Sequence, residues 1–230
     1  MARRIGIVAC SAEGAALCYR TIAIEGFHAM GEHDHPEVTL HSIPMARHME
    51  AIRRDEWEAV GELMLDSVRK AAAAGADFAI CPDNTLHQAL PYIRAVSPIP
   101  WLSIAEVVAE EAEHRGFGRV GVMGTKYLME GPVYPEAFRP RGIEWRIPPA
   151  ADRERINRAI FQELVNAVFT DETRALFDSV MRALGAEGCD AAALACTEIP
   201  LIVRPEEAPL PTLDSTRLLA RAAVRRALEP

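Results

Sequence analysis

The chain of 230 residues lacks any apolar run long enough for a membrane-spanning helix, which needs about 20 such residues. It also lacks an excess of positive charge, because its formal net charge is −8. Binding to nucleic acid depends on clustered lysine and arginine, so the composition argues against a nucleic-acid partner. A small anionic ligand is not excluded, since a single local arginine can bind a carboxylate inside an acidic protein.

Cysteine is sparse and follows no disulfide or metal-binding pattern. The five cysteines are an odd number, and no two of them form a Cys-x-x-Cys pair. This usage predicts a reduced chain in the cytoplasm. The first residues are basic and then apolar, but the polar segment at 10–14 follows too soon for a signal peptide. A first β-strand is expected there instead.

Short apolar segments alternate with segments of helical periodicity. Strands are expected at residues 4–9, 38–43, 78–81, 120–123 and 191–195, and helices at 12–30, 55–74, 86–96, 104–114, 156–168, 172–184 and 216–227. Strands that alternate with helices predict an α/β protein whose parallel sheets are flanked by helices. In such sheets ligands bind at the carboxyl ends of the strands.

One pattern occurs twice in the chain. Residues 75–87 and 188–200 each contain a glycine, an aspartate two residues later, an apolar run and a polar segment. Residues 4–11 and 119–125 match in the same order upstream. A repeat of this size predicts two related lobes rather than a solenoid. The expected N-terminal lobe comprises residues 1–100 plus 214–230, and the expected C-terminal lobe residues 101–213.

The two copies differ at a decisive residue. Eight residues after the glycine, the first copy has Asp83 and the second has Cys196. Equivalent positions with proton-transfer groups are what an enzyme with two acid/base residues requires. Asp83, Cys196, Ser11 and Thr125 all follow predicted strands. If the two lobes face each other, these residues are expected to converge on one cleft.

The polar segment that ends each copy of the repeat, here called an elbow, resembles a motif of a known family. Residues 83–87, Asp-Asn-Thr-Leu-His, resemble the Cys-Asn-Thr-x-His motif of the aspartate/glutamate racemase family, and residues 195–201 resemble its Gly-Cys-Thr-Glu-Ile-Pro-Leu motif. The resemblance implies two pseudo-symmetric α/β lobes with the active site in the cleft between them. It also implies a homodimer that racemises amino acids with two facing acid/base groups, without pyridoxal phosphate or another cofactor.

Three departures from the family pattern leave the reaction open. The first acid/base position is Asp83 rather than cysteine, residues 9–14 lack a Gly-Gly-Met type of sequence, and no lysine follows Glu163-Leu164 to bind a second carboxylate. The first hypothesis is a racemase or epimerase of a small carboxylate-bearing amino acid of the aspartate/glutamate type. The alternative is an isomerase, decarboxylase or lyase of a small dicarboxylate. A third hypothesis is a non-catalytic protein that binds a small acid.

The proposed pair is chemically unequal. The reference pKa is about 8.5 for a cysteine thiol and about 3.9 for an aspartate carboxyl. We therefore expect Asp83 to rest as the ionised base and Cys196 as the neutral acid, with coupled titrations. The structural alternatives are a helix-capping role for Asp83 and a small buried apolar role for Cys196. Cys10, Cys18, Cys81 and Cys189 are interpreted as structural.

Substrate binding is assigned to polar residues near the predicted elbows. Hydroxyl, amide and backbone donors for a carboxylate are expected from Ser11, Asn84, Thr85, Thr125 and Thr197. Their alternative role is turn formation and capping. Arg47 is expected to clamp a carboxylate with two hydrogen bonds, or else to lie at the solvated surface.

The sequence says less about the roles of Glu198 and the histidines. Glu198 is expected to orient neighbouring groups at the site, or to cap the helix that follows. His87 is expected to be structural or to support the site. Five histidines occur between residues 28 and 48, but their spacing matches no standard metal motif, so no metal site is predicted.

Overall fold

The computed structural model describes residues 2–229, which form two compact units. Unit 1 contains the chain up to Ile104 and again from Thr216 onward, and unit 2 contains Ala105–Ser215. The chain therefore leaves unit 1 once and returns to it once. Within the described residues, no helix is both long enough and apolar enough to cross a membrane.

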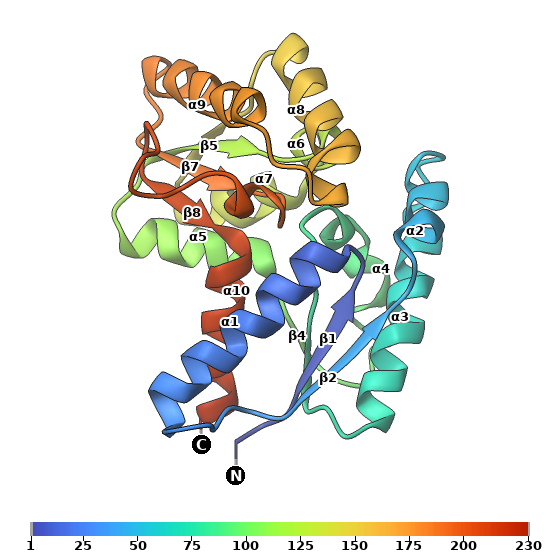
Figure 1. The fold of residues 1–230 in the computed structure, drawn as a ribbon. Helices are drawn as coiled ribbons and strands as arrows, with labels where there is room; N and C mark the ends of the chain where they lie inside the picture. Colours follow the sequence, from blue (N-terminus) through green and yellow to red (C-terminus); the bar gives the residue numbers. More distant parts are fainter. Residues whose placement is uncertain (1, 230) are drawn as a thin grey trace. The chain divides into compact units, whose positions relative to one another are not determined.

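Unit 1 contains a parallel sheet of four strands in the order β2-β1-β3-β4. The strands are β1 (Ile5–Ala9), β2 (Val38–Ser42), β3 (Phe78–Ile80) and β4 (Trp101–Leu102). Helix α1 (Ala12–Met30) connects β1 to β2, and α3 (Trp57–Ala73) packs along both of these strands (Figure 1). The central strands β1 and β3 are buried along their length, as expected for a sheet flanked by helices.

Unit 2 repeats this arrangement. Its parallel strands β5 (Arg119–Met123), β6 (Glu144–Arg146), β7 (Ala191–Leu194) and β8 (Thr212–Asp214) follow the order β6-β5-β7-β8. Each strand of unit 2 therefore has the same neighbours as the strand four places earlier in unit 1. The predicted α/β fold with two related lobes and parallel sheets is confirmed.

Helix α9 (Asp171–Ala186) illustrates how the sequence forms the core of unit 2. Its buried residues Phe177, Val180, Met181 and Leu184 are spaced at three and four positions, so they share one face of the helix. The hydroxyl of Thr170 caps the helix by accepting from Thr173 N at 3.1 Å. Helix α8 (Ala150–Gln162) contributes Ile156 and Ile160 to the same core.

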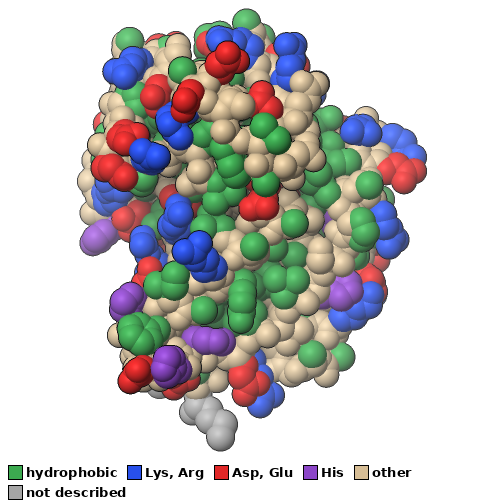
Figure 2. Space-filling view, viewed as in Figure 1, with side chains coloured by type: hydrophobic (Ala, Val, Ile, Leu, Met, Phe, Trp, Pro, Cys, Tyr) green, Lys and Arg blue, Asp and Glu red, His purple; other side chains and the backbone are tan. Residues whose placement is uncertain are grey.

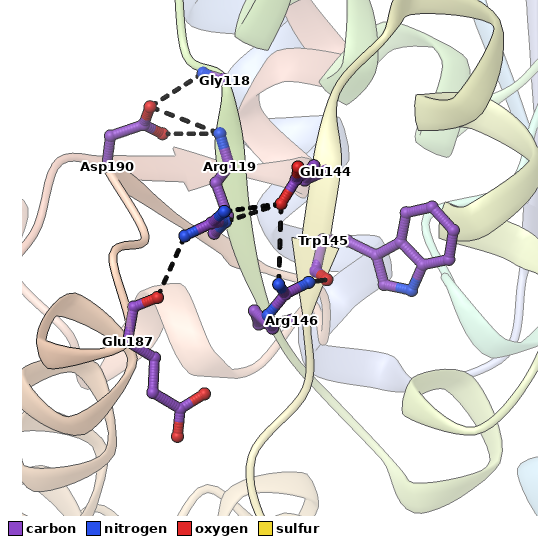
Figure 3. Close-up of polar contacts among 7 residues, drawn as sticks. All are labelled: Gly118, Arg119, Glu144, Trp145, Arg146, Glu187 and Asp190. Atoms are coloured by element: carbon purple, nitrogen blue, oxygen red, sulfur yellow. Dashed lines mark hydrogen bonds and ion pairs between the residues drawn. The ribbon is translucent and has the colours of Figure 1, made fainter.

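The glycine and aspartate of the sequence repeat lie at the amino edge of each sheet. In unit 2, Asp190 Oδ2 accepts hydrogen bonds from Gly118 N at 2.8 Å and Arg119 N at 3.3 Å (Figure 3). In unit 1, Asp77 Oδ2 accepts from Arg4 N at 2.7 Å. The aspartate of each copy therefore holds the start of the first strand of its unit.

Each glycine leaves room for an arginine beside this aspartate. Gly75 and Gly188 have φ values of +95° and +85°, which favour glycine. A Cβ atom at these positions would lie 2.8 Å from Arg4 Nη1 and 2.7 Å from Arg119 Nη1, respectively. The shared glycine and aspartate of the repeat thus form a corner at the amino edge of each sheet. This edge is opposite the carboxyl ends of the strands, where ligands bind in parallel sheets.

Three predicted helices need correction. The helix expected at 156–168 begins earlier, after Pro149, and ends at Gln162, because Glu163 leaves helical geometry (φ −120°) and Ala167 adopts a left-handed conformation (φ 56°). The helix expected at 55–74 begins at Trp57, because Asp55 is also left-handed (φ 57°). The segment expected at 86–96 forms a 3-10 helix, Thr85–Ala89, followed by the short α4 (Leu90–Ile93).

Several short elements escaped prediction. They are the strands β4, β6 and β8, the helices α2 (Met45–Ile52), α6 (Lys126–Met129) and α7 (Val133–Phe138), and three 3-10 turns, Arg139–Arg141, Leu164–Asn166 and Ile199–Leu201. Strands of two or three residues carry too few positions for an alternating pattern to emerge. The remaining helices, α5 (Ile104–His114) and α10 (Ser215–Leu228), match or nearly match their predicted bounds.

Helix α10 carries the chain back into unit 1. Arg3 N donates to Ala227 O at 2.8 Å, and the Arg226 guanidinium lies 5.1 Å from the centre of the Phe78 ring. Both ends of the described chain therefore belong to unit 1. On the face drawn in Figure 2, acidic and basic side chains are interspersed rather than gathered into one basic area.

Candidate functional site

The predicted site residues of unit 1 lie at the carboxyl edge of its sheet. Ser11 follows β1, Arg47 lies in α2 after β2, and Asp83 follows β3. Because β1 pairs in parallel with both β2 and β3, these three strands end at the same edge. The first sheet thus brings a hydroxyl, a guanidinium and a carboxylate to one side of unit 1.

Asp83 is half-buried and caps the segment that follows it. Its Oδ1 accepts a hydrogen bond from Leu86 N at 3.1 Å. This contact is the capping role that the sequence left as an alternative, and it engages one carboxylate oxygen. Asn84 and Thr85 come next in the chain, and both are buried. The capping contact fixes the direction of the carboxylate relative to these neighbours.

Cys81 stands two residues before Asp83 and is fully buried. Burial raises the pKa of the Cys81 thiol well above its ordinary value, and the negative charge of Asp83 raises it further. The thiol is therefore neutral at physiological pH. This supports the interpretation of Cys81 as a structural residue.

Arg47 presents a cation at this edge. Its side chain is exposed in the first turn of α2, a helix that the sequence analysis did not predict. Within residues 2–229, no hydrogen bond or ion pair engages its guanidinium. By contrast, Arg54, which closely follows the same helix, is held by Glu50 and Glu56. Arg47 is thus available for an anion.

Ser11 and Thr125 are equivalent residues of the two units, and both are N-caps. Ser11 Oγ accepts from Gly14 N, and Thr125 Oγ1 accepts from Leu128 N, each at 3.2 Å. The capping role that the sequence left open is therefore realised at both positions. A hydroxyl that accepts a hydrogen bond keeps its own proton for donation, so the Ser11 cap is compatible with substrate binding.

The unit 2 residues lie at the carboxyl edge of its own sheet. Thr125 follows β5, and residues 196–198 follow β7, the neighbour of β5. Cys196 and Thr197 are both buried. The Cys196 thiol donates to Glu198 Oε2 at 3.0 Å, and the Thr197 hydroxyl donates to the same oxygen at 3.1 Å. A thiol and a hydroxyl thus donate to one carboxylate oxygen at this elbow.

Glu198 is buried, and no ion pair between described residues engages its carboxylate. Only 2% of the residue is exposed, and among the described residues its Oε1 has no hydrogen-bond partner. Its side chain makes no capping bond to the 3-10 turn that follows, so the capping alternative for Glu198 is wrong. The unused oxygen of this buried carboxylate can accept a further hydrogen bond. The spacing of Cys196 and Glu198 is the only signal of their contact in the sequence.

The histidines between residues 28 and 48 do not form a metal site. His35 Nδ1 lies 2.8 Å from Pro36 O, and His41 Nδ1 lies 2.8 Å from Ser67 Oγ. His48 is buried within α2. In the part of the chain that the structure describes, no group of three or more histidine, cysteine or acidic side chains is placed to bind a metal ion.

Comparison with known proteins identifies a family and a curated relative that this chain resembles. The model of the Asp/Glu/hydantoin racemase family matches residues 5–223. A broad specificity amino-acid racemase, RacX, of Bacillus subtilis (strain 168) is 23% identical over 204 residues, covering 85% of this chain and 84% of the relative.

Solved structures show the same similarity. A putative Asp/Glu racemase from Yersinia pestis gives a TM-score of 0.87 at 27% identity, covering 99% of this chain and 100% of the other. An aspartate racemase homologue from Pyrococcus horikoshii OT3 gives a TM-score of 0.83 at 25% identity, with the same coverage of each chain.

Proposed function

Because the chain belongs to the Asp/Glu/hydantoin racemase family, we propose that it is a cofactor-independent racemase or epimerase of a small amino acid that carries a carboxylate. Membership of this family makes the protein an isomerase of the racemase type. The observation that carries the proposal is the hydrogen bond from the Cys196 thiol to the buried Glu198 carboxylate at the end of β7. An elbow that holds a thiol beside a proton acceptor is suited to acid/base work.

The proposed reaction moves a proton between two faces of the substrate α-carbon. In one direction Asp83 accepts the α-proton, and Cys196 donates its thiol proton to the opposite face of the carbanion. The enzyme is left with a protonated Asp83 and a Cys196 thiolate, which is the form required for the reverse direction. The mechanism requires both residues to approach the α-carbon from opposite sides.

Glu198 is proposed to accept the proton of the Cys196 thiol and to return it. Its Oε2 already accepts the proton of the resting thiol at 3.0 Å. Full transfer of this proton to Glu198 generates the thiolate without leaving two adjacent negative charges, which would repel each other in a buried site. Glu198 returns this proton to the thiolate before Cys196 acts as an acid, so that the thiol has a proton to donate to the carbanion.

Binding of the substrate carboxylate is proposed for the cation and donors of the two elbows. Arg47 supplies the positive charge, and a guanidinium can form two parallel hydrogen bonds to a carboxylate. Ser11, Asn84 and Thr85 act with it in unit 1, and Thr125 and Thr197 in unit 2. An anionic substrate in an acidic protein depends on such a local cation.

Asp83 favours a second candidate function. A carboxylate is a weaker base than a thiolate by about 4–5 pKa units, or roughly 6 kcal/mol of proton affinity. Such a base suits a substrate whose C–H is already acidic. The second candidate is therefore an isomerase, decarboxylase or lyase of a small dicarboxylate that uses the same residues.

The test is exchange of the substrate α-proton with deuterated water in the absence of pyridoxal phosphate. A panel of amino acids should include at least one that exchanges, and Asp83→Asn and Cys196→Ala should abolish the exchange. Product analysis on small dicarboxylates separates the second candidate from the first. Turnover that persists in both variants would remove the assigned pair from the mechanism, and no turnover on any substrate would favour a binding protein.

We also propose a homodimer in the cytoplasm. The dimer rests on the family resemblance, and light scattering on the purified protein tests it. The location rests on the five cysteines, all of which are free thiols. Free thiols persist in a reducing compartment.

A further inference from the structure

His87 links the Asp83 elbow to the residue at which the chain leaves unit 1. His87 is 5% exposed and lies in the 3-10 helix that follows Asp83. Its Nδ1 is 2.8 Å from Asp83 O, and Ile104 N donates to its Nε2 at 3.1 Å. Ile104 is the first residue of α5 and the last residue of unit 1 before the chain enters unit 2.

These two contacts fix the tautomer of the ring. A backbone N–H can only donate, so the Nε2 that faces Ile104 N carries no proton. The proton therefore resides on Nδ1 and is donated to Asp83 O. Burial lowers the pKa of His87 to about 4, so the ring is neutral over the physiological range. Neutral His87 is a fixed bridge with one donor and one acceptor.

Unit 2 has a counterpart of this bridge. The Ser215 hydroxyl donates to Leu194 O at 2.8 Å, and Ser215 is fully buried. Leu194 ends β7 two residues before Cys196, while Ser215 begins α10 and is the last residue of unit 2. In each unit, a side-chain hydrogen bond thus ties the elbow, or the strand end just before it, to the first residue of the helix in which the chain leaves that unit.

We propose that His87 is a positioning residue, which holds the Asp83 backbone against the start of α5 so that the carboxylate keeps the orientation needed for proton transfer. This role rests on the proposed function of Asp83. His87 itself neither gives nor takes a proton in the reaction. Its contribution is geometric, and small misplacements of a catalytic group can reduce a rate by about a hundredfold.

The first experiment tests the bridge without any substrate. Nitrogen NMR on the whole protein with labelled histidine should show one protonated and one unprotonated ring nitrogen for His87, with no titration down to about pH 5. Exchange between tautomers, or protonation of the His87 ring above about pH 5, would overturn the proposal.

The second experiment tests the consequence for catalysis. His87→Phe keeps a ring of similar shape and removes both hydrogen bonds, so kcat for α-proton exchange should fall by about 10- to 100-fold while KM changes less than about threefold. His87→Gln retains a donor and an acceptor in one amide and should recover part of the rate. If His87→Phe does not fold, the NMR result and the His87→Gln kinetics decide.

His41→Phe is the matched control, because it removes a histidine hydrogen bond of 2.8 Å elsewhere in unit 1. It should lower the melting temperature and leave kcat unchanged. If His87→Phe also lowers only the melting temperature, His87 is structural and the proposal fails. If Asp83→Asn keeps full activity, the proposed function of Asp83 fails instead, whatever the His87 variants do.

Discussion

At the scale of single residues, each elbow combines a thiol and a carboxylate in a different arrangement. In unit 1, Asp83 occupies the elbow position and the buried thiol of Cys81 precedes it. In unit 2, the thiol of Cys196 occupies that position and the buried carboxylate of Glu198 follows it. The asymmetry of the proposed acid/base pair thus includes the immediate neighbours of both residues.

Glu198→Gln should reduce kcat for substrate exchange by about 100-fold or more, because the amide cannot accept the thiol proton as a base. KM should change little, since the proposed role concerns the thiol rather than the substrate. Steady-state kinetics on the best substrate of the panel provide the measurement. Thr197→Val removes the other donor to the same oxygen, and because Thr197 is assigned to substrate binding it should change KM rather than kcat. Equal activity of Glu198→Gln and wild type would exclude the relay.

Arg47→Ala should raise KM by about 10- to 100-fold, the range expected for losing hydrogen bonds to a charged group. Arg47→Lys should recover little, because an ammonium cannot reproduce the two parallel hydrogen bonds of a guanidinium. Substrate titrations of both variants test this. Arg54→Ala is the matched control, since Arg54 is already paired with Glu50 and Glu56. A KM that does not respond to Arg47 would place it among ordinary surface residues.

At the scale of elements, the sequence predicted the long helices, whose apolar periodicity and end residues lie within the helix itself. Helix α1 has the predicted bounds, and α9 differs from its prediction by two residues or fewer at each end, because apolar periodicity and end signals agree over many residues. Helix α2 and the short outer strands were missed, since their formation depends on neighbours that are distant in sequence.

The same distinction applies to the candidate site. The positions of Asp83 and Cys196 after strands could be predicted from the repeat. The contact of Cys196 with Glu198 and that of His87 with Ile104 could not, because each depends on side-chain directions that only the folded backbone sets.

The corner aspartates allow a matched test across the repeat. Asp190→Ala should lower the free energy of unfolding by about 1–2 kcal/mol, because Gly118 N and Arg119 N lose their shared acceptor. Asp77→Ala should have a smaller effect, since among the described residues only Arg4 N donates to its carboxylate. Urea unfolding measures both. Asp66→Ala, which loses an exposed ion pair with Lys70, should leave stability almost unchanged. A larger loss of unfolding free energy for Asp77→Ala than for Asp190→Ala would contradict the roles given to these two hydrogen-bond acceptors.

At the scale of the whole molecule, the buried histidines with lowered pKa values both belong to unit 1. Burial lowers the pKa of both His48 and His87 to about 4, from 6.5, and the charge of Arg47 contributes at His48. Among the described residues, neither ring nitrogen of His48 has a hydrogen-bond partner. Between these pKa values the unfolded chain binds more protons than the folded chain, so stability is complete above about pH 6.5 and falls as the pH decreases towards 4.

Acid should therefore destabilise unit 1 more than unit 2. The loss between pH 6.5 and 4 is on the order of 3 kcal/mol for each histidine. Trp57 and Trp101 report on unit 1, and Trp145 on unit 2, so fluorescence of Trp145→Phe follows unit 1 alone. His48→Leu should flatten the pH dependence of this signal. A variant that retains only Trp145 should show the smaller response, and an equal response of both units would contradict the assignment.

The hydrogen bond from Arg3 N to Ala227 O has a consequence for protein engineering. Since Arg3 and Ala227 are hydrogen-bonded within unit 1, a short linker between these two segments would permit circular permutation. In a permuted chain opened between the units at α5, the segment from Thr216 onward would run directly into β1, and the first sheet would be encoded without interruption. Unit 1 would then be encoded by one continuous segment of the gene.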